Sequence, residues 1–196
     1  MGRLFSSMYD LTMIPFEKAG FQRVRRSLMS HVRGNVLEIG SGTGANFPFY
    51  QNATYVEAIE PNPEMIEKAS GKIKYATVPI QTYQAKAEQL PFPDQSFDAI
   101  TGTLVFCTIP DPVKALGEIK RVSKTGATFH FFEHVKVDHQ AAAKVQELLT
   151  PVWKAVCDGC HLNRPTIQLF EQAGFRVEKV KRYGGGVFVV FEGKVP

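Results

Sequence analysis

The stretch NVLEIGSGTGAN, residues 35–46, decides the fold. The apolar run VLEI leads directly into Gly40, Gly42 and Gly44, which is the order of a strand that turns tightly into a helix. Glycines at such a turn let the backbone approach a ligand that a Cβ atom would hold away. The same pattern also occurs in plain loops, so its interpretation depends on other residues of the chain.

Glu60 supports a ligand-binding interpretation. It ends a second apolar run, YVEAI at 55–59, and follows Gly40 by 20 residues. Parallel strands bring such a carboxylate to the glycine turn, where it accepts hydrogen bonds from both hydroxyls of a ribose. The pair of signals therefore predicts a ligand that contains a nucleoside.

Two ligand classes fit these glycines. Gly40-x-Gly42-x-x-Ala45 satisfies the dinucleotide fingerprint, so an NAD(P)-dependent oxidoreductase stays open. S-adenosyl-L-methionine has no phosphate and carries a sulfonium cation and an amino group. Glu38, two residues before Gly40, suits that cation better than it suits a phosphate and so favours S-adenosyl-L-methionine.

Composition and charge limit the function classes. The 196 residues are 44% hydrophobic and 21% charged, as expected of a globular domain with a core, which excludes a disordered chain. No apolar run is long enough to span a bilayer and no stretch resembles a signal peptide, so we expect a cytoplasmic protein. A net charge of +4 argues against a nucleic acid partner. The basic residues Arg23, Arg25 and Arg26 are interpreted as a solvated helix face, with an anionic membrane surface or acidic partner as the alternative.

Hydrophobic periodicity separates helices from strands. Apolar residues recur at helical spacing from 11 to 32 and predict an N-terminal helical region that ends near Gly34. Short apolar runs then alternate with helical stretches, as in parallel strands joined by crossover helices. The predicted strands are 36–39, 55–59, 97–101 and 127–132, and the predicted helical stretches are 63–70 and 111–122.

The C-terminal end follows a different pattern. FRVEKV at 175–180 and GVFVVFEG at 186–193 are separated only by a short glycine-rich loop, so these strands pair antiparallel. No repeat or linker divides the chain. The expected fold class is α/β: a Rossmann-like open, mostly parallel sheet with an antiparallel C-terminal hairpin and helices on both faces.

Three motifs in order, LEIGSGTGANFPFY, IEPNPEMIEKA and AEQLPFPDQSFDAI, resemble those of class I S-adenosylmethionine-dependent methyltransferases of the ubiquinone/menaquinone-biosynthesis type. The later segments TLVFCTIPDPVKALGEIKRVSKTGATFHFFEHV and LLTPVWKAVCDGCHLNRPTIQLFEQAGF resemble the mammalian membrane-associated thiol methyltransferases and their small bacterial relatives. The resemblance implies one methyltransferase domain over 1–196, with an N-terminal helical lid at 1–33 and a Rossmann-like core at 34–196. It also implies S-adenosyl-L-homocysteine as the product. The apolar anchor of the mammalian proteins has no counterpart here, so we expect no integral membrane segment.

The same resemblance implies a cofactor site. The glycine loop wraps the methionine part, Glu60 holds the ribose, residues 61–65 and 87–88 flank the adenine, and 103–104 face the methionine tail. The quinone-type relatives have an Asp where this chain has Lys86, so the adenine contact departs from the family pattern. The candidate cofactor-binding residues are Tyr9, Glu38, Gly40, Ser41, Gly42, Gly44, Glu60, Pro61, Met65, Ala87, Glu88, Thr103 and Leu104.

A thiol acceptor must lose its proton, because the thiolate is the reactive form. His134, expected with Glu133 just after the fifth strand, is one candidate base, and Asp158 is the other. The alternatives are a histidine that only hydrogen-bonds a loop and an ordinary turn residue beside Gly159. Trp153 is expected to form an apolar wall of the acceptor pocket.

The segment Cys157-Asp-Gly-Cys160-His161 matches a haem-attachment pattern, and C-x-x-C also occurs in redox and zinc sites. Haem attachment needs export, and zinc needs further ligands, so we expect no metal and interpret these residues as packing or acceptor-site lining. Cys107 is expected at a buried strand end, and the odd number of cysteines argues against a disulfide framework.

The sequence thus favours an S-adenosylmethionine-dependent methyltransferase that acts on a small, apolar acceptor, with a thiol preferred and a quinone or lipid amine as alternatives. Its expected partner is that small-molecule acceptor and not a nucleic acid, and peripheral membrane contact stays open. A non-catalytic S-adenosylmethionine-binding protein is the remaining alternative.

Overall fold

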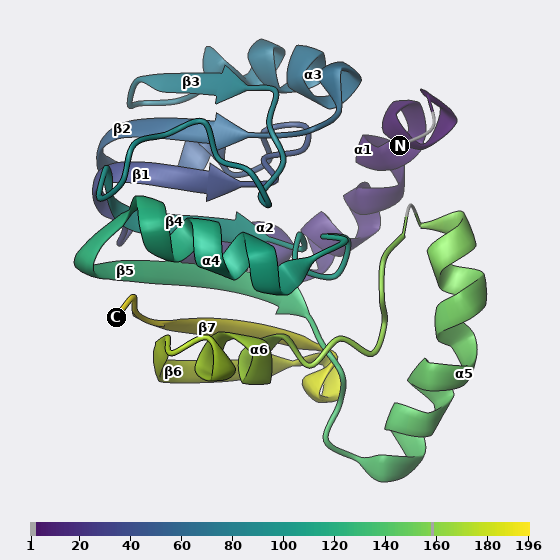
Figure 1. Ribbon diagram of the computed structural model, residues 1–196. Coiled ribbons are helices and arrows are strands. Elements are labelled where there is room, and N and C mark those ends of the chain that lie inside the picture. The colour runs from purple at the N-terminus through teal and green to yellow at the C-terminus, as the bar shows by residue number, and fades with distance from the viewer. Residues whose placement is uncertain (1–2, 158) are drawn as a thin grey trace.

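Seven strands form one sheet in the order β3-β2-β1-β4-β5-β7-β6 (Figure 1). The computed structural model describes residues 3–157 and 159–196, with side chains from Asp10 onward. The strands are β1 (Arg33–Ile39), β2 (Asn52–Ile59), β3 (Ile80–Tyr83), β4 (Phe97–Thr103), β5 (Ser123–His134), β6 (Arg176–Tyr183) and β7 (Phe188–Lys194). The helices are α1 (Arg3–Phe16), α2 (Gln22–Met29), α3 (Pro63–Ile73), α4 (Pro112–Val122), α5 (Gln140–Val156) and α6 (Thr166–Gln172), with short helical turns at Glu17–Phe21, Phe47–Phe49 and Gly184–Gly186.

The predicted fold class is confirmed. Strands β3, β2, β1, β4 and β5 run parallel, and β7 runs antiparallel to both β5 and β6. The more apolar strand of the C-terminal hairpin takes the inner place: Val189 and Phe191 of β7 are fully buried, whereas β6 exposes most of its charged residues at the sheet edge. The apolar pattern did not mark β3, which is a four-residue strand at the other edge.

Two hydrophobic clusters sandwich the sheet. Helices α4 and α6 cover one face (Figure 1), where Phe170 of α6 packs against Phe106 and Phe131 at centroid distances of 4.8 and 5.0 Å. On the other face, Leu28 of α2 belongs to a cluster with Phe132 of β5. Both faces of the sheet are therefore covered. In such sheets ligands bind beyond the carboxyl ends of the parallel strands. Their arrows in Figure 1 point toward the side where α1 and α5 lie.

The N-terminal helical region predicted from the periodicity over 11–32 is present, and it contains a kink. Gly20 has a φ of 135° inside the turn Glu17–Phe21, a conformation that residues with a Cβ rarely adopt. The chain bends there, and α2 then buries Leu28 while α1 leaves Leu11 65% exposed.

Helix α5 lies beside the sheet (Figure 1) and buries only Ala143, Gln146 and Thr150. The Gln146 side chain fastens it to the chain after β5, because its carbonyl accepts from the Val137 N–H (2.9 Å) and its amide donates to the Val135 carbonyl (3.0 Å). Among the helices that the structure describes, none has the length and apolar character to cross a bilayer.

Candidate cofactor and acceptor site

The glycine loop has the backbone that its sequence predicts. Gly40, Gly42 and Gly44 all have positive φ, at 63°, 54° and 75°. A Cβ on Gly40 would overlap the Val105 side chain, but a Cβ on Gly42 would meet no described atom within 4 Å. The loop is therefore tightly packed at Gly40 and open at Gly42, where a ligand can approach the backbone.

Glu60 and the glycine loop meet at the carboxyl ends of β1 and β2, as the sequence predicts. The buried Glu60 carboxylate accepts from the Gly42 N–H (3.1 Å) and from the Asn62 N–H (3.0 Å). Beside it, Ser41 Oγ and Asn62 Nδ2 are buried and have no hydrogen-bond partner among the described residues. Buried polar atoms are nearly always paired, so these two are available to a ligand.

A cavity of about 530 Å³ opens beside Glu60 and Asn62. Five of the predicted cofactor residues line it: Gly40, Glu60, Pro61, Ala87 and Glu88. Residues 108–110 and Gly159 also line it. The volume lies within the range of small-molecule sites. The cavity therefore suits the nucleoside part of a cofactor.

The adenine side of this cavity differs in detail from the expectation. Met65 is buried on α3 and does not belong to the cavity lining. Lys86 does line the cavity. The Glu88 carboxylate accepts from the Asp111 N–H at 3.2 Å and so is turned toward the start of α4.

A buried polar network lies at the carboxyl ends of β1 and β4. The Glu38 carboxylate accepts from Asn46 Nδ2 (2.8 Å) and from the Tyr50 hydroxyl (2.9 Å). Asn46 Oδ1 accepts from Arg25 (3.0 Å), and the Thr103 hydroxyl also hydrogen-bonds Arg25. Burial raises the pKa of Glu38 to about 7, although its hydrogen bonds and the Arg25 charge oppose that rise. The network thus joins an acidic and a basic group.

Arg25 corrects the interpretation of the basic cluster. Its side chain is only 3% exposed and pairs with Glu17 at 2.9 Å, whereas Arg23 and Arg26 are exposed. The helical spacing contained the signal, because Arg25 lies three residues before the core residue Leu28 and therefore on the inward face of α2. An arginine on an apolar stripe indicates a buried partner.

The predicted methionine-tail residues lie in the same region. Thr103 ends β4 and is buried, with its hydroxyl in the Arg25 network. Leu104 follows with a φ of 57°, a strained value for a residue with a Cβ, and its N–H donates to the Phe132 carbonyl at 2.7 Å. Such strain is often found at functional sites.

Helix α1 contacts the glycine loop. Tyr9 lies in α1, and its side chain is outside the described part of the structure. Its neighbour Asp10 accepts from the Thr43 hydroxyl at 2.7 Å and from Lys72 at 3.3 Å. These bonds tie α1 to the glycine loop and to α3.

Glu133 fixes the loop that walls the cavity. Glu133 and His134 had been expected just after the fifth strand, but they are the last two residues of β5. The fully buried Glu133 carboxylate accepts from the Val105 and Phe106 N–H groups, both at 3.1 Å. Burial raises the pKa of Glu133 to about 8, against the effect of these two hydrogen bonds.

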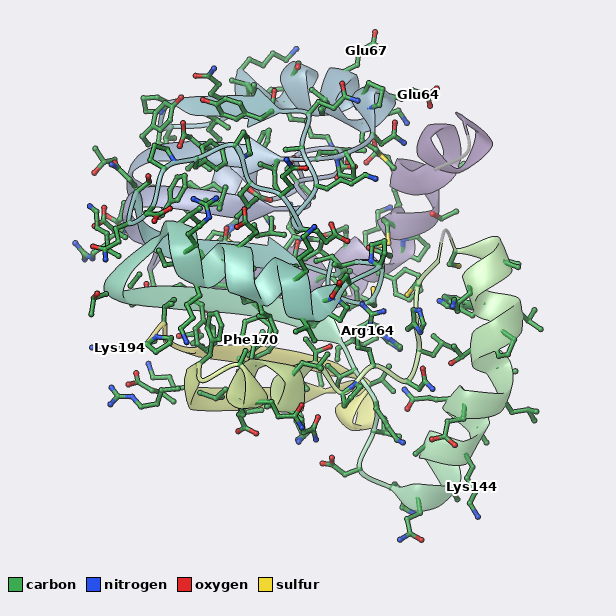
Figure 2. All side chains as sticks on the ribbon, viewed as in Figure 1. Glu64, Glu67, Lys144, Arg164, Phe170 and Lys194 are labelled. Carbon is green, nitrogen blue, oxygen red and sulfur yellow. The ribbon has the colours of Figure 1, made fainter. Side chains whose placement is uncertain are left out.

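Arg164 holds the same loop through its carbonyl groups. Its side chain donates to the carbonyls of Phe106 and Ile109, the latter at 2.6 Å. In Figure 2, Arg164 lies close to the carboxyl end of β5. The loop after β4 is therefore held by a buried acid at its N–H groups and a buried base at its carbonyls.

Of the two candidate bases, the structure describes only His134. His134 packs edge-on against Phe188 at 5.6 Å and hydrogen-bonds the backbone of His161. Burial lowers the pKa of His134, so its imidazole is neutral near pH 7, and its buried Nδ1 has no partner within the described residues. His134 does not line the cavity. Asp158 lies outside the described residues.

The cysteines are free thiols, two of them in contact. Cys107 is buried, but it lies in the turn after β4 and not at the strand end that had been predicted. A hydrogen bond to Cys160 raises the pKa of the Cys107 thiol, and burial adds to this rise. Trp153, expected as an apolar wall, contacts Cys160 and is 44% exposed.

Comparison with known proteins identifies the family. Residues 37–131 match a family described as a methyltransferase domain. Thiol S-methyltransferase TMT1B of Rattus norvegicus is 34% identical over 182 residues, which are 86% of this chain and 73% of that protein. Phosphatidylethanolamine N-methyltransferase of Cereibacter sphaeroides is 31% identical over 130 residues, 64% of each chain. A SAM-dependent methyltransferase from Aquifex aeolicus shares the fold, with a TM-score of 0.60 and 21% identity over 83% of this chain and 82% of that one.

The residues present fit S-adenosylmethionine, the methyl donor that this family uses. The unpaired Asn62 amide and the cavity beside Glu60 suit a nucleoside, the open face at Gly42 and the unpaired Ser41 hydroxyl suit the adjoining part of the cofactor, and Glu38 suits a cation. The dinucleotide interpretation of the same glycines is therefore not retained. The chain belongs to the class I S-adenosylmethionine-dependent methyltransferases.

Proposed function

We propose that this methyltransferase transfers the methyl group to the sulfur of a small, apolar thiol. The observation that carries this proposal is the 34% identity to the rat thiol S-methyltransferase over 86% of the chain. The similarity is supported by the geometry, because Gly159, in the segment after α5, lines the cavity beside the glycine loop.

The cofactor-binding residues have distinct roles in this proposal. Glu60 holds the ribose while its bonds to Gly42 and Asn62 keep the glycine loop closed around it. Gly40, Ser41, Gly42 and Gly44 surround the methionine part, and Pro61, Ala87 and Glu88 form the adenine end, with Met65 buried in the adjoining helix α3. When bound, S-adenosylmethionine supplies a methyl group on a positively charged sulfur, so the protein has to align the acceptor and exclude water.

The Glu38 network is suited to the amino acid end of the cofactor. A free amino acid group carries an ammonium and a carboxylate, and Glu38 and Arg25 supply the opposite charges in a buried setting. Asn46 lies between Glu38 and Arg25 and bonds both, so the two side chains do not form a direct ion pair. In this proposal Glu38 is the subsite for the ammonium and Arg25 the subsite for the carboxylate. Thr103 and Leu104 complete this end of the site, and Tyr9 belongs to the helical lid over it.

A thiol acceptor must be deprotonated before it attacks the methyl group. We assign this step to His134, whose neutral imidazole has an unpartnered Nδ1, with Asp158 as the second candidate. The clamp of Glu133 and Arg164 on the loop 104–110 positions the wall against which the acceptor lies.

A lipid amine is the second candidate acceptor. The similarity to phosphatidylethanolamine N-methyltransferase over 64% of the chain favours it. An amine acceptor and a quinone acceptor would use the same cofactor site, so only the identity of the product separates them from a thiol.

The proposal includes one domain over residues 1–196, with residues 1–33 as a helical lid over the core at 34–196. It also includes a cytoplasmic location, which the three free thiols support, because thiols stay reduced in that compartment.

A matched acceptor panel tests the proposal. The purified full chain and S-adenosylmethionine are incubated with hexanethiol, hexanol, hexylamine or a short-chain hydroquinone, and methylated products are identified by mass spectrometry. We expect methyl hexyl sulfide as the main product. A methylated amine or quinol in place of the sulfide would refute the thiol assignment, and S-adenosylhomocysteine binding without any product across wider panels would indicate a non-catalytic binding protein.

A further inference from the structure

Helix α5 turns its apolar side chains toward solvent. Five aliphatic residues are between 51% and 79% exposed: Val145, Leu148, Leu149, Val152 and Val156. Their spacing places them on one side of the helix, here named the α5 stripe. A surface helix normally directs such a stripe to the core, and α5 instead directs Gln146 and Thr150 inward.

Hydrogen bonds fix this orientation. Gln146 bonds the backbone of Val135 and Val137, and the Thr150 hydroxyl donates to the Gln146 carbonyl at 2.6 Å. Rolling the helix to bury the α5 stripe would break the two Gln146 bonds and leave buried backbone groups unpaired, which is costly. The outward stripe is therefore a stable feature of the fold.

We propose that the α5 stripe docks on an anionic lipid surface. The charges of α5 favour this occupant. Exposed Lys144 borders the stripe one turn before Leu148, and Figure 2 shows it extending outward near the N-terminal end of the helix, whereas exposed Lys154 lies on the other side of α5. Glu147, the single acidic residue of α5, is paired with Lys136 at 2.7 Å. An apolar stripe bordered by a lysine whose charge is not paired with the acidic residue of the helix is the pattern of a helix that lies in a membrane interface.

Trp153 adds a second argument. It lies at the edge of the α5 stripe, 44% exposed, and it is the single tryptophan of the chain. Tryptophan is enriched at the boundary between lipid and water, because its ring is apolar and its N–H is polar. Its position at the edge of an exposed aliphatic stripe fits that boundary.

The size of the stripe argues against a second copy of the chain. Residues 145–156 extend about 17 Å, and a helix is about 10 Å wide, which gives a footprint of roughly 200 Å². A stable protein interface buries about 800 Å² on each partner. A helix that lies beside the body of the protein presents a convex surface, which meets a flat bilayer without a matching groove.

Docking would also orient the catalytic cavity. Helix α5 leads directly into the segment that contains Gly159, which lines the cavity. The cavity side of the molecule is then held near the lipid phase, into which an apolar thiol partitions. This consequence rests on the proposed function, whereas the docking itself does not.

Trp153 provides the readout for a direct test. The full chain is mixed with vesicles of phosphatidylcholine that contain phosphatidylglycerol, and separately with pure phosphatidylcholine vesicles. Tryptophan emission and co-sedimentation are measured. We expect a blue shift and sedimentation with the anionic vesicles, weakened by salt because surface charge attraction is screened.

Leu148→Glu and Val152→Glu should each lower the partition coefficient roughly tenfold or more, since each places a carboxylate against anionic lipid. Val113→Glu is the matched control: Val113 is 67% exposed on α4, and the substitution should leave partition unchanged. S-adenosylhomocysteine binding by isothermal titration checks that all three variants are folded, whatever the acceptor.

Three outcomes would overturn the proposal. The first is that the wild-type chain does not bind anionic vesicles. The second is that Val113→Glu loses as much binding as the stripe variants do. The third is that light scattering detects a dimer that only the stripe variants dissociate. The last outcome would assign the α5 stripe to contact between two copies of this chain.

Discussion

Glu38 and Arg25 lie on opposite sides of one side-chain amide. Asn46 donates to the Glu38 carboxylate at 2.8 Å and accepts from the Arg25 guanidinium at 3.0 Å. Arg25 makes its own ion pair with Glu17, at 2.9 Å. The amide thus joins two buried charged groups from segments that are distant in sequence, which is the arrangement on which the proposed amino acid subsite rests.

Replacement of Arg25 tests this arrangement. Arg25→Met leaves Glu17 and the buried Glu38 without their cation, so we expect a loss of about 3 kcal/mol in the free energy of unfolding. S-adenosylhomocysteine affinity should fall by about tenfold or more, since a charge-assisted hydrogen bond is lost. Thermal denaturation and isothermal titration measure the two effects. Arg26→Met, on the exposed side of α2, is the control and should change neither quantity. A folded Arg25→Met protein with wild-type affinity would remove Arg25 from the site.

Glu60 is tested with the cofactor alone. Glu60→Gln keeps the volume but removes the negative charge that the ribose hydroxyls and two backbone N–H groups share. We expect S-adenosylhomocysteine binding to weaken by about 1 to 3 kcal/mol, measured by titration calorimetry. Glu57→Gln, on the strand β2 that precedes Glu60, removes a carboxylate that accepts from Tyr83 and should leave affinity unchanged. Equal affinity in both variants would contradict the ribose assignment.

The pKa of Glu38 predicts a pH-dependent stability. Its folded pKa of about 7 lies above the ordinary value of 4.5, so the folded state binds the proton more tightly than the unfolded state does. Glu38 therefore stabilises the fold below pH 4.5 and loses that contribution as pH rises to about 7, by on the order of 3 kcal/mol. Glu38→Gln has no such proton, so the stability difference between the two proteins should change over this window. Denaturant unfolding at several pH values measures it, and a constant difference would show that the Glu38 pKa is unshifted.

The same titration affects the cofactor. Only ionised Glu38 attracts the ammonium group, so affinity for S-adenosylhomocysteine should rise with pH from 6 to 8 in the wild type and stay level in Glu38→Gln. Affinity that is level in both proteins would argue against contact between Glu38 and the ammonium.

Glycine 40 should not tolerate a side chain. In Gly40→Ala the new Cβ would overlap Val105 and occupy a φ of 63°, so we expect a destabilisation of about 1 to 3 kcal/mol and weaker cofactor binding. Gly117→Ala is the matched change in α4, where a Cβ meets no described atom within 4 Å, and it should stabilise by about 0.5 to 1 kcal/mol. Melting temperatures compare the two variants. A Gly40→Ala protein as stable as the wild type would show that the loop adapts.

His134 is tested by turnover and not by binding. His134→Gln should lower methyl transfer to a thiol by about 100-fold, the usual contribution of a general base, and spare S-adenosylhomocysteine affinity. The lowered pKa of His134 keeps the base form present, so wild-type activity should persist below pH 6.5. His31→Gln, an exposed histidine, is the control. Full activity in both His134→Gln and Asp158→Asn would discard both candidate bases.

Much of the geometry of the candidate cofactor site was predictable because its signals are local. A strand that runs into glycines and a carboxylate at the next strand end must meet at one sheet edge when the strands are parallel. The Glu60 bond to the Gly42 N–H follows from that rule. Arg25 was missed because its charge suggested solvent, although its helical position did not.

The contacts of Glu133 and Arg164 with the loop 104–110 could not be predicted from the sequence. Glu133 and Arg164 are 31 positions apart in the chain, and neither belongs to a motif that indicates backbone partners. Glu133 reaches the loop after β4 from the neighbouring strand β5, whereas Arg164 reaches it only because the chain returns to the sheet after α5.

The sequence by itself determined the alternation of strands and helices, the glycine turn, the position of Glu60 and the antiparallel end, because each depends on residues close in the chain or on the direction of neighbouring strands. Only the tertiary structure decided the burial of Arg25 against Asn46, the insertion of β7 between β5 and β6, and the outward direction of the α5 stripe. Periodicity reveals that a helix has an apolar side, but which side faces the protein depends on contacts with distant residues. For α5, the two hydrogen bonds of Gln146 decided that the apolar side faces outward.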